Sequence, residues 1–250
     1  MRKLLGALRR ALNDFDMIAD GDKVAVGISG GKDSLALLYA LSLYQKFAPE
    51  SFDLVGVMID LGFEGTEGPV GKIKEFCDGI GVEFVVEKTD IADVVFNQRK
   101  EKNPCSLCSK MRRGALNTVV KRIGANKLAL GHHSDDVLDT FLLSFIYEGR
   151  LSTFMPVTYL DRMDVTVIRP FVYAEEGDIK GAIKRFELPV MTSPCPADKH
   201  TQREYMKQLV QNICKDIPIA RDRMTQAVVS SERYNLFPPK KNVQNKIDKE

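Results

Sequence analysis

The sequence predicts an α/β fold in which a parallel sheet is flanked by helices. Three observations lead to this prediction. Short apolar, β-branched runs alternate along the chain with longer runs of helical periodicity. The length of 250 residues suits one large α/β domain, or a core domain with small appendages. Apolar residues make up 44% and charged residues 28%, as in ordinary soluble globular proteins.

The first half of the chain supplies three expected strands. It opens with leucines at helical spacing, which predict an amphipathic helix, followed by a turn rich in Asp and Gly. Each strand is a short β-branched run followed by a helical pattern. We expect helices at 3–18, 35–47 and 70–80, and strands at 24–28, 52–59 and 83–86.

The second half continues the alternation after an irregular segment. Because strands that alternate with helices form right-handed βαβ units, the sheet should be parallel and covered on both faces. We expect helices at 110–123, 134–147, 175–186 and roughly 201–214, and strands at 127–130 and 165–168. In domain terms, residues 1–22 form an N-terminal helix, 23–237 the main domain and 238–250 a polar tail.

Charge and hydropathy exclude several classes of protein. The net charge is only +2, so any nucleic-acid contact must come from local basic patches. No apolar run approaches the roughly 20 residues that span a bilayer. Residues 1–10 are basic but lack an apolar core and a cleavage site, so we expect a cytoplasmic protein with no membrane partner. In that reducing compartment the five cysteines are not expected to form a disulfide framework.

A loop of small and charged residues follows the first strand, in the order Ser29, Gly30, Gly31, Lys32, Asp33, Ser34. The glycines let the backbone approach an anion, and the next helix presents unpaired N–H groups and the positive end of its dipole. Lys32 adds a cation. The loop therefore predicts a polyphosphate site, although it is not a standard P-loop, since Val26 stands at the position of that motif's first glycine.

Acidic residues lie at the ends of two further strands. Asp135 and Asp136 follow Gly131 after the fourth strand, where carboxylates suit Mg²⁺ that neutralises ATP phosphates. Ser134 or Asp135 can equally cap the following helix, and the two roles are compatible. Asp60 ends the second strand and is expected near the nucleotide, because ligands bind at the carboxyl ends of parallel strands.

Two cysteines, Cys105 and Cys108, form a Cys-x-x-Cys pair before a basic helix. Nearby positive charge favours the thiolate, but the pair alone does not distinguish zinc, iron–sulfur and redox roles. Cys195 lies between two prolines that fix the backbone, which favours a positioned ligand. Cys77 and Cys214 lie in helical patterns and are expected to be buried thiols without a chemical role.

Taken together, these motifs resemble the tRNA 2-thiocytidine synthetase family, a cluster-containing branch of the PP-loop ATP pyrophosphatases. The resemblance runs from about residue 8 to residue 236. It implies a PP-loop ATPase fold, related to the adenine nucleotide alpha hydrolase and Rossmann-like folds. The motifs that carry it are the Ser-Gly-Gly-Lys-Asp-Ser loop, Cys105 to Ser109 with Arg112 to Gly114, Gly131 to His133 with Asp135 and Asp136, and Pro194 and Cys195 with Gln202 and Arg203.

The resemblance implies an enzyme that uses ATP, Mg²⁺ and a [4Fe-4S] cluster to thiolate tRNA. ATP adenylates the C2 oxygen of a base, an anticodon-loop cytidine, and sulfur carried on the cluster displaces AMP. Cys105, Cys108 and Cys195 match the cluster ligands. One departure stands against cytidine specificity, because Ala197, Asp198 and Lys199 occupy the place of a further cysteine. The catalytic residues are expected to be Lys32, Asp33 and Asp135, and the ATP-binding residues to be those of the loop with Asp60, Gly131 and Asp136.

The expected partners are tRNA and a sulfur donor, either a cysteine desulfurase or free sulfide; a homodimer is left open. Lys110, Arg112, Arg113 and Arg203 are candidates for tRNA contacts, and solvated helix faces are the alternative. Two other functions remain open. One is the same adenylation on another tRNA base or a small molecule, and the other is a nucleotide-binding protein without turnover.

Overall fold

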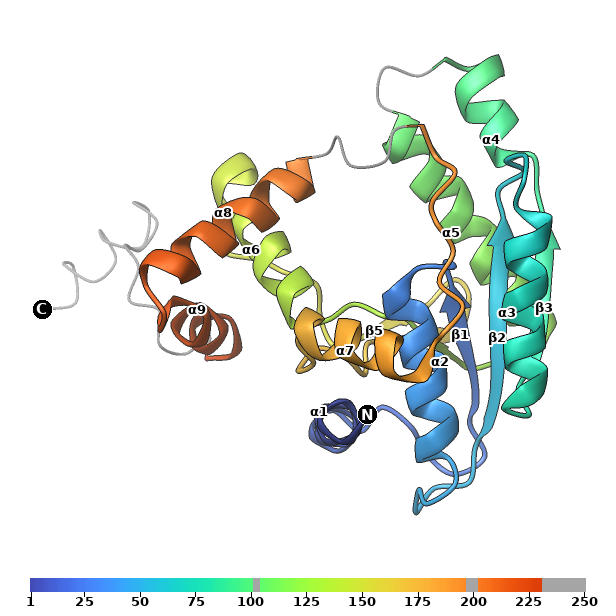
Figure 1. Ribbon diagram of the computed structural model, residues 1–250, viewed down its shortest axis with the longest axis horizontal. Helices are drawn as coiled ribbons and strands as arrows, with labels where there is room; N and C mark the ends of the chain where they lie inside the picture. The colour runs from blue at the N-terminus through green and yellow to red at the C-terminus, as the bar shows by residue number, and fades with distance from the viewer. Residues whose placement is uncertain (101–103, 197–201, 231–250) are drawn as a thin grey trace, which may run out of the picture.

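Figure 1 shows the computed structural model, which describes residues 1–100, 104–196 and 202–230, with a sheet between layers of helices. The six-stranded sheet has the order β3-β2-β1-β4-β6-β5. All neighbouring strands run parallel except β5 and β6, which form an antiparallel pair at one edge. The strands are β1 (Lys23–Ile28), β2 (Asp53–Asp60), β3 (Glu83–Lys88), β4 (Lys127–Ala129), β5 (Val157–Leu160) and β6 (Val165–Ile168).

The helices follow the expected order, with differences at several ends. The predicted helix at 35–47 begins three residues earlier, because it starts directly at the phosphate loop. The helices are α1 (Arg2–Asp14), α2 (Lys32–Tyr44), α3 (Glu67–Gly79), α4 (Ile91–Asp93), the π-helical turn η1 (Val94–Gln98), α5 (Pro104–Arg122), α6 (Ser134–Glu148), α7 (Glu176–Phe186), α8 (Gln202–Asp216) and α9 (Ala220–Val229).

The sheet separates two hydrophobic cores. Alternating side chains of β1 divide between them: Val24, Val26 and Ile28 pack with α1, α2, α3 and α7, whereas Ala25 packs with α4, η1 and α5. Burial of this parallel strand on both faces explains its continuous apolar sequence. Helices α6, α8 and α9 contact one another and form a separate group (Figure 1).

Three expectations for the chain are corrected here. The helix expected at 110–123 starts at Pro104, since proline is favoured at a first helical position, so Cys105 and Cys108 lie inside its first turns. The irregular segment before it contains α4 and η1. Strand β5 and helix α9 were not expected; β5 is a four-residue edge strand, too short for a clear alternation. The predicted tail at 238–250 lies outside the described residues.

The strand order reverses direction at β1, which has β2 on one side and β4 on the other. Ligands of open α/β sheets bind at such a point, beyond the carboxyl ends of the strands. The phosphate loop leaves β1 there, and the segment Gly131–His133 leaves β4 beside it. The fold therefore brings together the two motifs that the sequence marks as nucleotide-binding.

Candidate active site

The phosphate loop is held in shape by its own hydroxyl groups. The Ser29 N–H donates to Ser34 Oγ at 3.1 Å, and Ser34 Oγ donates to the Gly31 carbonyl at 3.0 Å. The Gly31 N–H donates to Ser29 Oγ at 3.2 Å. Gly30 has φ of +82°, a conformation that glycine adopts without strain. Helix α2 starts at Lys32, so its unpaired N–H groups lie directly beside the loop.

The segment after β4 packs against this loop with no room for a side chain at Gly131. A Cβ there would lie 2.9 Å from the Asp33 carbonyl, so only glycine permits the contact. Next to it, His133 stands among three carboxylates, 3.4 to 3.5 Å from Asp33, Asp135 and Asp136. Burial lowers the pKa of His133, but its contact with Asp135 and the surrounding negative charge raise it overall.

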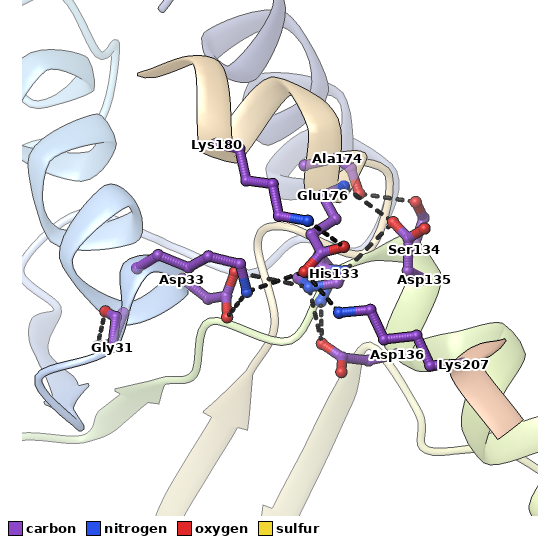
Figure 2. A network of polar contacts seen from close by, with 12 residues as sticks. Gly31, Asp33, His133, Ser134, Asp135, Asp136, Ala174, Glu176, Lys180 and Lys207 are labelled. Carbon is purple, nitrogen blue, oxygen red and sulfur yellow. Dashed lines mark hydrogen bonds and ion pairs between the residues drawn. The ribbon is translucent and has the colours of Figure 1, made fainter. Parts of the chain in front are cut away.

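Figure 2 shows the ion-pair network that joins the N-terminal ends of α2, α6 and α7. Glu176, the first residue of α7, is buried and contacts the ammonium groups of Lys32 at 3.1 Å, Lys180 at 3.1 Å and Lys207 at 2.8 Å. Despite the cost of burial, these lysines lower the pKa of Glu176 to about 2. Lys32 also contacts Asp33 Oδ2 at 2.9 Å.

Asp135 is engaged by the protein through both carboxylate oxygens. Oδ1 accepts a hydrogen bond from Arg221 at 2.7 Å, and Oδ2 accepts one from the Glu176 N–H at 2.9 Å. Despite burial, His133 and Arg221 hold the pKa of Asp135 well below its usual range. This geometry does not fit Asp135 as a direct magnesium ligand, and that role stays a prediction. A better fit is Asp33, whose buried Oδ1 has no hydrogen-bond partner among the described residues.

Two cavities flank the phosphate loop and share Ser29 and Arg112. The smaller, of about 260 Å³, lies beyond β1 and β2 and is lined by Asp60 and Cys195 as well. The larger, of about 700 Å³, lies between α5, α6 and the sheet and is lined by Asp33, Gly131 and Asp136, among others. The loop thus forms the boundary between a compartment near the cysteines and a roomier one near α6.

The predicted cluster cysteines come from two distant segments. All five cysteines of the chain are free; Cys105 is exposed, and Cys108 and Cys195 are partly exposed. Burial raises the pKa of the Cys108 thiol, Arg112 lowers it, and negative charge on Cys195 and Cys105 raises it further. Positive charge at Arg112 therefore favours the thiolate as expected, but burial outweighs it and the pKa of Cys108 is raised overall.

The mutual influence of these thiols shows that the fold brings the segment before residue 196 to the start of α5, as Figure 1 also shows. Within the described residues, no three His, Cys, Asp or Glu side chains converge tightly enough to hold a single metal ion. Cysteines that ligate a four-iron cluster each bind a different iron, so they stand further apart. That Cys105, Cys108 and Cys195 together hold a cluster stays a prediction.

The basic candidates divide between the larger cavity and the surface. Arg112 and Arg113 line that cavity, and so does Arg203, whose guanidinium lies 3.6 Å from Asp136 Oδ1. Lys110 is exposed on α5. Cys77 is fully buried as expected, whereas Cys214 is only partly buried.

Sequence reasoning missed several residues of the site. Glu176 and Lys180 were hidden in an ordinary amphipathic helix, and Arg221 lies on the unexpected α9. Lys207 lies in the helix expected at roughly 201–214 and had no assigned role, yet its ammonium group contacts buried Glu176. The signal in the sequence that could have identified Glu176 is the acidic pair Glu175–Glu176, which follows a strand and a short connection.

Comparisons with known proteins agree with this arrangement. A family model for the PP-loop domain matches residues 4–213. The tRNA-cytidine(32) 2-sulfurtransferase of Pelobacter propionicus is 37% identical over 239 residues, covering 94% of this chain and 88% of the relative. The chain belongs to the tRNA-cytidine(32) 2-sulfurtransferase family of PP-loop proteins. The member from Stutzerimonas stutzeri is 40% identical, over 95% of this chain and 87% of its own.

Solved structures extend the likeness of this sulfurtransferase family member to its fold. The U34-tRNA thiolase NcsA from Methanococcus maripaludis, solved with its [4Fe-4S] cluster, superposes with a TM-score of 0.76 at 27% identity, over 96% of this chain and 80% of that one. The NH3-dependent NAD synthetase from Campylobacter jejuni shares the fold alone, with a TM-score of 0.51 at 13% identity over 95% and 98% of the two chains. The expected α/β PP-loop fold is therefore confirmed. No helix in the described part of the chain is long and apolar enough to cross a membrane.

Proposed function

We propose that this protein is an ATP-dependent tRNA sulfurtransferase, which replaces the C2 oxygen of a cytidine in the anticodon loop with sulfur. Family membership supports the reaction class, and the two cavities that share Ser29 and Arg112 support its geometry. They allow a nucleotide and a target base to approach the same loop from opposite sides. The curated relatives act on cytidine 32, and we propose the same position here.

ATP would occupy the smaller cavity, with Asp60 near its nucleoside and its phosphates on the loop. The N-terminus of α2 and Lys32 then stabilise negative charge as it develops on the phosphates. The C2 oxygen of the base attacks the α-phosphorus, and the α–β bond breaks with its electron pair leaving on pyrophosphate. Asp33, whose Oδ1 has no hydrogen-bond partner among the described residues, would hold Mg²⁺ more readily than Asp135, and Asp136 lines the same cavity as Asp33.

The larger cavity suits an unstacked base. Besides Asp33, three of its lining side chains have a buried polar atom without a hydrogen-bond partner in the described chain: Asn117 Oδ1, His132 Nδ1 and Arg169 Nε. The ring of Phe154 lies 5.0 Å from that of His132 and 5.1 Å from the guanidinium of Arg169. Polar groups beside an aromatic ring are the usual means by which proteins bind bases of single-stranded RNA. Arg113 and Arg203 would contact neighbouring phosphates, and Lys110 would extend that contact on the surface.

Cys105, Cys108 and Cys195 would hold a [4Fe-4S] cluster with one iron free of protein ligands. When bound, the cluster supplies the sulfur that displaces AMP from the adenylated base. Arg112 lies between the Cys108 thiol and both cavities, so it would attract the phosphates of ATP or RNA toward the thiols. Free sulfide or a cysteine desulfurase is proposed as the donor, and a cytoplasmic location and a homodimer stay predictions.

The test is to purify the protein without oxygen, measure iron and sulfide, and incubate it with ATP, sulfide and tRNA. Nucleoside analysis should find 2-thiocytidine, formed only with ATP, together with AMP and pyrophosphate. Detection of 2-thiouridine without 2-thiocytidine would show that the protein acts on another base. In that case a transcript with cytidine 32 replaced by uridine should still be thiolated. AMP formation without any thionucleoside would refute sulfur transfer.

A further inference from the structure

The buried carboxylate of Glu176 gathers three ammonium groups from three helices. Lys32 of α2 and Lys207 of α8 both contact Oε1, at 3.1 and 2.8 Å, and Lys180 of α7 contacts Oε2 at 3.1 Å (Figure 2). Lys32 also contacts Asp33 at 2.9 Å. Three ammonium groups therefore surround the single carboxylate of Glu176, and Asp33 contacts one of them, Lys32.

The backbone adds to this positive potential. The N-terminal ends of α2 and α7 both reach the group, since Lys32 and Glu176 are the first residues of those helices. Helix N-termini carry partial positive charge and unpaired N–H groups, which stabilise anions. Lys32 and Lys207 contact the same oxygen atom, so two like charges stand side by side. An arrangement of this kind is stabilised by an anion of more than one negative charge.

We propose that Lys207 and Lys180 join Lys32 in binding the pyrophosphate half of ATP. This inference rests on the proposed cleavage of ATP into AMP and pyrophosphate. Lys32 belongs to the phosphate loop, and Lys180 and Lys207 are held beside it through their shared contact with Glu176. Each ammonium group can turn from Glu176 to a phosphate oxygen, and Glu176 keeps the group together before the nucleotide arrives.

The placement of Lys207 separates it from a role in RNA binding. Its side chain is 29% exposed and lies against buried Glu176, whereas that of Lys180 is 58% exposed. We therefore expect Lys207 to contribute more than Lys180. Arg203, four residues earlier on α8, pairs with Asp136 at the larger cavity. Helix α8 thus carries one residue for the phosphates and another for the base compartment.

The test compares the binding of inorganic pyrophosphate and AMP to Lys207→Met by titration calorimetry. A charge-assisted hydrogen bond lost in a partly buried site should raise the Kd for pyrophosphate about 10-fold or more. The Kd for AMP should stay within about twofold, because AMP lacks the β- and γ-phosphates. Lys215→Met, at the exposed end of the same helix, is the matched control and should leave both constants unchanged.

Lys207→Arg should retain most of the pyrophosphate affinity, because it keeps the charge. The proposal is overturned if Lys207→Met binds pyrophosphate like the parent, or if its affinities for pyrophosphate and AMP fall equally, which a general structural defect would cause. These titrations use no tRNA. A parent protein that binds pyrophosphate as described but forms no thionucleoside would therefore contradict the proposed function and leave this inference standing.

Discussion

The phosphate side and the cysteine side of the molecule are built in opposite ways. On the phosphate side, the N-terminal ends of α2, α6 and α7 already contact one another: Lys32 pairs with Glu176, His133, the residue before α6, contacts Asp33, and the Glu176 N–H donates to Asp135. On the cysteine side, Cys105 is exposed and its two partners are partly exposed, and only their charges link them. The contacts of the phosphate side are thus made within the protein, whereas among the described residues the three cysteines interact with one another only through their electrostatic influence.

This difference predicts that the two sides fail separately. A change among the cysteines should stop sulfur transfer and spare nucleotide binding, because the phosphate network does not depend on them. A change in the phosphate network should slow ATP cleavage, and thiolation with it, while the cysteines still bind iron.

The largest effect is expected from Cys195→Ser. The cluster loses one of its three proposed thiolates, so iron content should fall and thiolation should be abolished, while ATP still binds. Iron and sulfide analysis after anaerobic reconstitution, with nucleoside analysis of the tRNA, measures both results. Cys77→Ser, on a fully buried thiol of α3, is the matched control and should keep both. A Cys195→Ser protein with a full cluster and normal thiolation would show that the three-cysteine site is wrong.

Lys32→Ala should lower the rate of AMP formation about 10²–10³-fold, the usual loss when one charged contact to the transition state is removed. Its iron content should match that of the parent, in contrast to Cys195→Ser. Lys46→Ala, exposed just beyond the same helix, serves as the control. Near-parental AMP formation by Lys32→Ala would contradict the assignment of the phosphate loop.

The double variant Arg112→Ala, Arg113→Ala tests two arginines of α5 that line the larger cavity, of which Arg112 also lines the smaller one. If each arginine contacts an RNA phosphate, the slope of log affinity for tRNA against log salt should fall by about 0.7–0.9 for each lost contact. The matched control is Lys121→Ala, Arg122→Ala, at the far end of α5, where Arg122 is paired with Glu87. Equal salt slopes in the double variant and the parent would show that Arg112 and Arg113 do not contact RNA phosphates and belong to a solvated helix face.

The smallest effect concerns stability. Burial and the charges of Asp136 and Asp135 raise the pKa of buried Asp139 to about 6. Between pH 3.8, the ordinary pKa of an aspartate, and about pH 6, the carboxyl of Asp139 is protonated in the folded state and ionised in the unfolded state. The free energy of unfolding therefore declines as the pH rises from about 4 to 6. Asp139→Asn should remove that decline, making the variant more stable than the parent above pH 6 by about 1–3 kcal/mol. Urea unfolding at pH 4 and pH 7.5 measures it; a gain at pH 4 alone would contradict it.

Features that depend on a short segment could be predicted from the sequence, whereas features that depend on contacts between distant segments could not. The strand at 165–168 and the Ser29–Ser34 loop are local patterns, and the structure places both as expected. The network at Glu176 depends on the packing of α7 against α2 and of α8 against α6, which no short segment of sequence reveals. In the sequence alone, Lys207 cannot be distinguished from a solvent-exposed lysine, because its contact with Glu176 depends on where α8 packs. The start of α5 was misplaced because Cys105 and Cys108 were assigned to a segment before the helix, whereas the helix begins at Pro104, a residue favoured at the first helical position.

Cys195 shows an intermediate case. Its flanking prolines marked a rigid position, but its nearness to α5 arises only because the chain after α7 returns along the sheet. Family resemblance, and not spacing, connected it with Cys105 and Cys108.

The central claim is that ATP activates the base oxygen that sulfur replaces, and an isotope label tests it most directly. A tRNA whose target cytidine carries ¹⁸O at C2 is incubated with the anaerobically reconstituted protein, ATP and sulfide, and the AMP is analysed by mass spectrometry. The mechanism predicts one ¹⁸O in the phosphate of AMP for each 2-thiocytidine formed. AMP without the label, alongside 2-thiocytidine, would contradict adenylation of the base oxygen.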